Sequence, residues 1–367
     1  PTFDASPAIS QDPESNPLAL NQTLRDGSEQ IIHAEADEDL PDLINSNHFD
    51  GVIDIILPHF GDQAPIGLSK AGKTLASLIS RQRQPVSIDN LSSAGNRGIV
   101  TAGLSLNTKG YSYYLFDLTA STTTKLGDFY FQQKHGDRLV TTAAIHIIAR
   151  DGMQLNALVL RPKGVDGPVP MVVKVHGGAA HHVEWEYNHF RQFLVNRGYA
   201  LLALNSRGSD GSGNAYKAAG LGEYGRKMQD DLVDATNWAV DQGIADPNAL
   251  AIMGSNYGGY AAAMALIRDL ALFKAAIIEH AMLYVAYQSQ YPPHSWGLHL
   301  ALWQRYFGNV ENPDGPKQMQ QRFPMAKIDC LQAATLMVAG KRDGVISFGQ
   351  AEKFIKQVKA ANKKSIV

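Results

Sequence analysis

Cysteine and long apolar runs are both scarce in this sequence. Cys330 is the only cysteine among 367 residues, which excludes an internal disulfide and fits a reducing compartment. No apolar run approaches the ~20 residues that a membrane helix needs. Residues 1–17 lack the basic flank and apolar core of a signal peptide. We therefore expect a cytoplasmic protein without a membrane segment, with a leader upstream of Pro1 left open.

An excess of charge of either sign is missing too. The 35 acidic and 33 basic residues leave a net charge of −2, which gives no reason to expect nucleic acid or an anionic membrane as a partner. No cofactor is expected either. The composition is that of an ordinary globular protein, and the length suggests two domains. The oligomeric state stays open, a homo-oligomer included.

The first 140 residues are dominated by short β-like runs. GVIDIIL (51–57), RGIVTAGLSL (97–106) and YSYYLFDL (111–118) are separated by turn residues, and a return strand is expected after the last. Only 71–82 has a clear helical pattern. Strands at short spacing with few helices predict an all-β N-terminal segment over 1–140.

From residue 141 onward, strands alternate with helices. Two runs flank Asp151-Gly152, a hairpin signal. Apolar spacing predicts helices over 228–242 and 349–361. Buried strands are expected at 169–175, 199–205, 250–254, 274–279 and 335–340. This alternation predicts an α/β domain over 141–367, with a mostly parallel sheet covered on both faces.

In such sheets functional groups lie at the carboxyl ends of the strands, and the loop HGGAAHHVEWE (176–186) follows an early one. A His-Gly-Gly loop at this place supplies one oxyanion-hole N–H in α/β-hydrolases, which points to Gly178 or Ala179. The alternative is a tight strand-to-helix turn. A metal site is not expected, because His176, His181, His182 and Glu184 lack the His-Glu-x-x-His spacing and lie on a glycine loop.

The elbow sequence GSNYGGY (254–260) carries the main puzzle. Gly254, Gly258 and Gly259 provide the small neighbours that a strand-to-helix nucleophile elbow needs, and Asn256 stands at its centre, where a serine is expected. Asn tolerates the left-handed backbone, but a carboxamide is no nucleophile. Ser255 is a poor substitute, because neighbouring side chains at a strand end point in opposite directions. The backbone N–H of Tyr257 offers the second oxyanion donor.

Two other loops bear on the site. Asp343, in GKRDGVI after a late strand, stands where this fold carries the acid of a catalytic triad, with a capping or solvated Asp as the alternative. The triad histidine should follow it, yet the last histidine of the chain is His299. In the loop 205–232, Arg207 holds a substrate carboxylate or, as we favour, braces the loop through an ion pair.

These motifs together resemble the prolyl oligopeptidase family of serine peptidases, especially its acylaminoacyl-peptidase and dipeptidyl-peptidase-like branch. The resemblance spans about 151–350 and rests on DGMQLNALVLRPKG, VHGG, NRGYALLALNSRGSDGSG, GEYGRKMQDDLVDATNWAVDQGIADP, IMGSNYGGYAA and GKRDGVI. It implies an α/β-hydrolase fold preceded by a partial β-propeller-like segment.

The resemblance also implies roles for single residues. Asn256 takes the nucleophile position and Asp343 the acid position, while Tyr257, Gly177 and Gly178 take the oxyanion-hole positions. Arg207 and Glu223 match family loop residues that are largely structural. The family histidine lies beyond residue 367, and most propeller blades would precede residue 1. We therefore expect a fragment that lacks the last strand and helix of the hydrolase domain.

The resulting expectation is a serine-peptidase scaffold that acts on short peptides through an acyl-enzyme, inactive or severely impaired because of Asn256. One alternative is a non-catalytic peptide-binding protein that keeps the pocket. Four aromatic residues are candidates to line such a pocket: Trp185, Tyr187, Trp296 and Trp303. We expect at least half of them to pack in the core instead. A second alternative is an esterase with a small β lid formed by the N-terminal segment.

Overall fold

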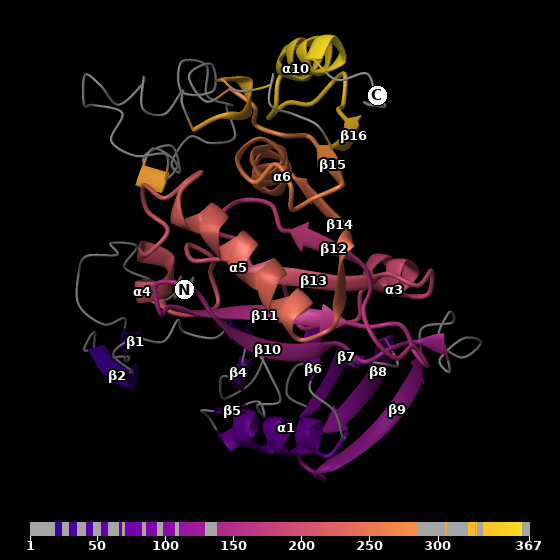
Figure 1. Cartoon of the computed structure of the whole chain (residues 1–367). Helices are drawn as coiled ribbons and strands as arrows, with labels where there is room; N and C mark the ends of the chain where they lie inside the picture. The colour runs from indigo at the N-terminus through magenta and orange to yellow at the C-terminus, as the bar shows by residue number, and fades with distance from the viewer. Residues whose placement is uncertain are drawn as a thin grey trace. The chain divides into compact units, whose positions relative to one another are not determined.

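The chain divides into two compact units, shown in Figure 1. Residues 1–106, 111–129 and 210–218 form unit 1, and residues 107–110, 130–209 and 219–367 form unit 2. The structure is a computed structural model, and the residues that it describes are 19–23, 29–34, 42–46, 53–57, 66–67, 70–82, 86–93, 98–106, 110–128, 138–284, 305–306, 322–326, 328 and 333–361. Cys330, Trp296 and Trp303 lie outside these residues.

Unit 1 is built from antiparallel strands. Its largest sheet is a four-stranded meander in the order β6-β7-β8-β9, the form that a propeller blade takes. Two smaller sheets have the orders β1-β2 and β3-β4-β5. The strands are β1 Ala19–Thr23, β2 Glu29–Ala34, β3 Asp42–Ser46, β4 Ile53–Leu57, β5 Ile66–Gly67, β6 Val86–Ser93, β7 Ile99–Leu106, β8 Gly110–Asp117 and β9 Thr122–Asp128.

One helix supplies the core of this unit. Helix α1, Lys70–Ser80, places Leu75, Leu78 and Ile79 on one face, as apolar residues three and four apart do. That face packs on buried side chains of β7 and β8, among them Leu104 and Phe116. The helix and the strands predicted at 51–57, 97–106 and 111–118 are confirmed. The short helix α4, Asn214–Ala218, is grouped with this unit.

Unit 2 contains a seven-stranded sheet in the order β10-β11-β13-β12-β14-β15-β16. Strands β10, β11 and β13 are antiparallel neighbours, whereas β13, β12, β14, β15 and β16 run parallel. The strands are β10 Ala143–Ile148, β11 Gln154–Leu160, β12 Val169–Val175, β13 Ala200–Asn205, β14 Ala245–Ser255, β15 Ala275–Glu279 and β16 Ala334–Val338. The predicted mostly parallel α/β sheet is confirmed, as is the hairpin at Asp151-Gly152, where Gly152 has a φ of 88°.

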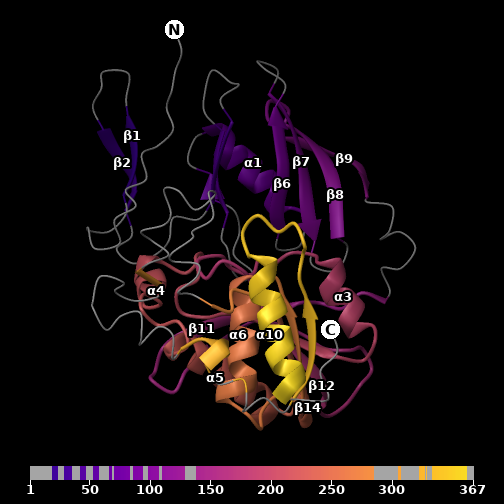
Figure 2. The ribbon, with the colours of Figure 1, turned by 90° about the horizontal axis from the view of Figure 1, so that it is seen from above.

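Helices cover this sheet. Helix α5, Lys227–Asp241, crosses the strands in Figure 1, and α6, Tyr257–Arg268, packs against β12, β14 and β15. Helix α10, Phe348–Ala361, is the yellow helix of Figures 1 and 2. Helix α3 is His189–Val195, and the ammonium of Lys174 on β12 stacks over its Phe190 ring. A 3-10 turn, Pro324–Ala326, lies between β15 and β16 in the chain.

The centre of the sheet is buried. Every residue of β13 is buried, and α6 is buried from Tyr257 to Ile267. Burial of apolar side chains on this scale stabilises the sheet by about 25 cal/mol per Å². Parallel pairing sets the register of β12 against β14 and of β14 against β15. Those strand ends carry the candidate site. None of the helices in the described ranges has the length and apolar character needed to cross a bilayer.

Candidate active site

Asn256 forms a sharp turn between β14 and α6. Its backbone has a φ of 57° and a ψ of −114°, a strained conformation that few residues other than Gly, Asn and Asp adopt. The turn is held from both sides: the Asn256 N–H donates to Glu279 O at 3.1 Å, and the Asn256 carbonyl accepts from Tyr260 N at 3.1 Å. The predicted elbow geometry is therefore present with an asparagine at its centre.

The glycines around the turn let three backbones approach one another. A Cβ at Gly258 would lie 2.8 Å from His176 O, and one at Gly259 would lie 2.6 Å from Glu279 O. A Cβ at Gly254 would meet the backbone of Gly258. Real Cβ atoms are essentially never found so close to backbone, so only glycine fits where β14, the turn and α6 meet.

The side-chain oxygen of Asn256 accepts a hydrogen bond from a backbone N–H of the site. Its Oδ1 accepts from the Tyr257 N–H at 2.8 Å, capping the first turn of α6. This N–H is the donor that the sequence predicts for the oxyanion hole. Asn256 thus differs from a serine in two ways: it has no nucleophilic oxygen, and its carboxamide oxygen keeps the Tyr257 N–H engaged. The oxyanion role of that N–H remains a prediction.

The glycine loop after β12 flanks the turn. A Cβ at Gly177 would lie 3.7 Å from the Asn256 Cβ and 3.5 Å from Ser255 O, so the loop passes directly beside residue 256. Gly178 has a φ of 81° and is buried. Ala179 is turned back on the loop, its N–H donating to Gly177 O at 3.3 Å. The oxyanion roles of Gly177 and Gly178 remain predictions, and the Ala179 N–H is already engaged.

His176 is braced within this loop. Its Nδ1 lies 2.8 Å from Gly177 O and its Nε2 lies 2.9 Å from Ser209 Oγ. Desolvation lowers the pKa of His176 to about 4, so the ring is neutral at pH 7. His181 and Glu184 are exposed, and across the described ranges no three His, Cys, Asp or Glu side chains gather as metal ligands do.

The neutral His176 gives the domain a pH-dependent stability. Its pKa falls from 6.5 to about 4 on folding, so below pH 6.5 the unfolded chain binds a proton that the folded chain does not. Stability from this group is complete above pH 6.5 and is lost as the pH falls towards 4. Between about pH 7 and about pH 5 we expect urea unfolding to report a loss of about 1–3 kcal/mol.

A His176→Gln variant should lack this loss. The comparison is between slopes of stability against pH, because the substitution also changes the value at neutral pH. His189→Gln, at an exposed position of α3, is the matched control and should keep the native slope. Equal slopes for His176→Gln and the unchanged chain would contradict the assignment.

Ser255 is the last residue of β14 and pairs in register with Glu279 of β15. Asn256 follows it at the turn, where its carboxamide is bonded to the Tyr257 N–H. The alternation expected at the end of a strand therefore places the Ser255 side chain on the sheet face and separates it from the cap of α6. A shifted nucleophile at Ser255 has no support in this geometry.

Asp343 lies in the loop after β16. Its Oδ1 accepts from Val345 N at 2.8 Å and from Ile346 N at 3.0 Å, and its Oδ2 lies 3.3 Å from His280 Nδ1. Burial acts to raise the pKa of Asp343, but the two backbone N–H groups and His280 outweigh it and lower the pKa below its ordinary value. The residue is thus an ionised carboxylate that faces a histidine.

That histidine is one that sequence reasoning missed. Chain order in this fold places the triad histidine after the acid, so the sequence pattern pointed only to residues beyond Asp343. His280 comes directly after β15, at the carboxyl end of the strand beside the elbow, and this position was the available signal. The pairing of Glu279 with Val338 brings it beside the Asp343 loop.

Arg207 forms ion pairs that connect its loop to two other segments of the chain, as we expected for a structural role. It is 3% exposed and forms bidentate bonds with Asp231 of α5 and with Asp151 of the hairpin turn. Glu223 accepts from Lys227 N at 3.2 Å at the start of α5. Trp185 donates its Nε1–H to Thr142 O at 3.0 Å, and Tyr187 is buried. Substrate contacts of Arg207 and Trp185 remain predictions.

The sequence of this chain is similar to those of known proteins. Residues 185–367 match the sequence profile of the prolyl oligopeptidase family. Dipeptidyl aminopeptidase BIII of Pseudoxanthomonas mexicana is 33% identical over 260 residues, which is 68% of this chain and 37% of the relative. Dipeptidyl peptidase family member 6 of Caenorhabditis elegans is 31% identical over 51% of this chain and 26% of the relative. The chain therefore spans about a third of the length of these relatives.

Solved structures share the fold at low identity. A puromycin-hydrolyzing peptidase of Mycobacterium tuberculosis has a TM-score of 0.78 at 20% identity, covering 96% of this chain and 54% of that one. The acylaminoacyl peptidase of Pyrococcus horikoshii has a TM-score of 0.74 at 17% identity, with coverage of 94% and 53%. The predicted α/β-hydrolase fold is confirmed, and the chain belongs, through residues 185–367, to the prolyl oligopeptidase family.

Proposed function

We propose that this chain is a serine-peptidase scaffold that binds short peptides at the carboxyl ends of β12, β14 and β15 and is catalytically impaired by Asn256. Its relatives carry the names of dipeptidyl and acylaminoacyl peptidases, which supports a peptide as the ligand. The observation that carries the proposal is the Asn256 side chain. It offers no nucleophile and keeps the Tyr257 N–H occupied.

The expected loss of activity is large. Removing the nucleophile of a triad costs about 10⁶ in kcat, and a blocked oxyanion donor costs a further factor of about 10² or more. The purified chain should therefore show no labelling by a fluorophosphonate. Stoichiometric labelling mapped to Ser255, abolished in Ser255→Ala, would overturn the assignment of position 256.

Binding is tested separately from chemistry. Isothermal titration with short peptides, bearing free or acylated N-termini, should detect a complex with the unchanged chain. Gly177→Val should abolish it, because a Cβ fits at this position and a larger side chain would fill the space beside Asn256. Gly349→Ala, in α10, is the control that should bind as the unchanged chain does.

The same titration separates the alternatives. A peptide-binding protein without chemistry would bind peptides and stay inactive when Asn256 is replaced by serine in a chain that also carries the family's histidine. An esterase with a small β lid would bind no peptide and would hydrolyse activated esters after the same replacement. Absence of peptide binding by a folded chain would overturn the proposal.

A further inference from the structure

A surface cavity lies between helix α1 and the β8–β9 turn of unit 1. Its volume is about 500 Å³, which is within the range of pockets that hold small molecules. One wall is the outward face of α1, and the other includes Ser121 of the turn. Leu75 and Ile79 of α1 belong to the same buried cluster as Phe116 of β8, so both walls rest on one core. The cavity is therefore a feature of a single folded unit.

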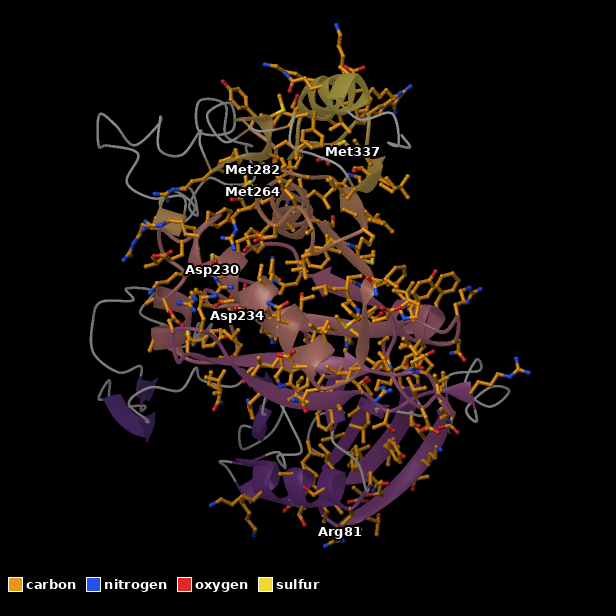
Figure 3. All side chains as sticks on the ribbon, viewed as in Figure 1. Arg81, Asp230, Asp234, Met264, Met282 and Met337 are labelled. Atoms are coloured by element: carbon orange, nitrogen blue, oxygen red, sulfur yellow. The ribbon has the colours of Figure 1, made fainter. Side chains whose placement is uncertain are left out.

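Three cations line this cavity. They are Lys70, Lys73 and Arg81, and the exposed Ser77 lies between them. The spacing i, i+3, i+7 and i+11 places these four residues on one helical stripe, which we call the cationic stripe. The Arg81 N–H donates to Ser77 O at 3.3 Å and so continues the last turn of α1. Figure 3 shows the labelled Arg81 at the solvent side of α1, where a ligand can reach it.

The charges of the cationic stripe are not neutralised by neighbouring side chains. Within the part of the chain that the structure describes, Lys70, Lys73 and Arg81 belong to no ion pair. Asp117, the acid of the β8–β9 turn, accepts two backbone N–H groups of its own turn at 2.9 Å and 2.8 Å. Three cations around one cavity produce a local positive potential, which attracts anions.

Two of the cations lie at the end of the helix that disfavours them. Lys70 is the first residue of α1 and Lys73 is the fourth, and the first turn contains no acidic residue. The N-terminus of a helix carries a partial positive charge, so cations at this end destabilise the helix. Departures from local rules of this kind are expected at binding sites. An anion bound in the cavity would compensate the repulsion between the two lysines and the helix.

We propose that this cavity binds an organic phosphate, a small molecule that carries phosphate groups on an organic body. A phosphate monoester has a charge of about −1.5 to −2 at pH 7, whereas a carboxylate has a single charge, so phosphates balance three cations with fewer groups. Lysine ammonium groups bind phosphate as point charges. The hydroxyls of Ser77 and Ser121 supply further donors, and the buried Leu78 gives the body an apolar contact. This proposal is independent of the peptide site in unit 2.

Calorimetric titration of the full chain tests the site with three compounds: ADP, inorganic pyrophosphate and citrate. We expect ADP to bind most tightly, because it adds an organic body to two phosphates. Pyrophosphate should bind more weakly, and citrate, with three carboxylates, at least about tenfold more weakly again. Raising the ionic strength from about 0.05 M to about 0.5 M should weaken all binding, because exposed charges are screened. Citrate that binds as tightly as pyrophosphate would overturn the assignment to phosphates.

The variant Lys70→Gln/Lys73→Gln locates the site. It should weaken ADP binding by a factor of about 10² or more, about tenfold for each charged hydrogen bond lost. Without ADP the same variant should unfold at a higher temperature than the unchanged chain, because two cations leave the helix N-terminus. Lys359→Gln, at an exposed position in the last turn of α10, is the matched control. It should leave ADP binding unchanged and should not raise the unfolding temperature, because a cation is favourable there.

Ser77→Glu is a second test that does not remove a cation. It places a carboxylate in the middle of the cationic stripe, at an exposed position where glutamate is a good helix former, so the chain should fold. ADP binding should then be lost, because the carboxylate repels the phosphates and pairs with the cations. Two results would overturn the proposal: no binding of ADP or pyrophosphate by the folded, unchanged chain, and equal ADP binding by Lys70→Gln/Lys73→Gln.

Discussion

Replacing Asp231 by alanine should destabilise the α/β unit by about 3–5 kcal/mol, enough to unfold much of the population at 37 °C. Asp231 has no exposed surface and receives the Arg207 backbone N–H at 2.9 Å as well as the guanidinium. Removing the carboxylate leaves the Arg207 charge 3% exposed, with Asp151 as its remaining partner. A buried charge that loses a partner costs several kcal/mol, whereas the pair itself contributes little net stability.

The network also joins three segments that are distant in the chain. Arg207 follows β13, Asp231 lies on α5, and Asp151 forms the turn of the β10–β11 hairpin. Hydrogen bonding to Arg207 holds the pKa of Asp151 well below its usual range. Burial raises the pKa of Asp231, and Arg207 acts in the opposite direction. The Asp231 carboxylate therefore depends on Arg207 to stay ionised, and Arg207→Met should be as destabilising as Asp231→Ala.

Chemical unfolding measures these effects, with Asp234→Ala as the matched control. Asp234 lies on the same helix, near the labelled Asp230 in Figure 3, and its Oδ1 pairs with Arg150 Nη2 at 2.7 Å. Asp234 is 12% exposed and also accepts the Arg150 backbone N–H, but the Arg150 side chain is 53% exposed and water can solvate it, so this loss should be about 1–2 kcal/mol and smaller than that at Asp231. The double variant Arg207→Met/Asp231→Leu should be milder than either single variant. Additive losses in the double variant would contradict the account.

Much of the scaffold could be predicted because its signals are local. The run of apolar residues in β13 indicates a strand buried on both faces, and helical spacing marks α5 and α10. Gly254, Gly258 and Gly259 reveal the elbow, because each is required by a close backbone approach. Each of these patterns involves residues that lie within about a dozen positions of one another in the chain.

The contacts within the site could not be predicted, because they depend on strand pairing and on side-chain torsion angles. His280 reaches Asp343 only because Glu279 pairs with Val338, two segments some sixty residues apart that no local pattern connects. The bond from the Tyr257 N–H to Asn256 Oδ1 depends on the rotamer of Asn256, which the sequence does not specify. His280 also precedes Asp343 in the chain, whereas the triad order of this fold predicts a histidine after the acid.

Gly258→Ala should destabilise the chain by about 3 kcal/mol or more, even though alanine is the better helix former. Gly258 is the second residue of α6, and the added Cβ would meet Val175 O, with His176 O at 2.8 Å and Val175 C at 2.9 Å. These atoms are backbone at the end of β12, so they cannot rotate away as a side chain would. Either β12 or the start of α6 must move.

Gly349→Ala is the matched control, because Gly349 is also the second residue of its helix, α10. The nearest atom to its added Cβ is Ser347 Oγ at 3.6 Å, an ordinary contact, so this variant should be stabilised by up to about 1 kcal/mol. Thermal and urea unfolding of the two variants should therefore change in opposite directions. Equal changes would show that β12 and α6 separate at little cost. Gly177 follows β12 and Asn256 precedes α6. If β12 and α6 can separate easily, the glycine loop and the elbow turn are not held at a fixed distance from each other.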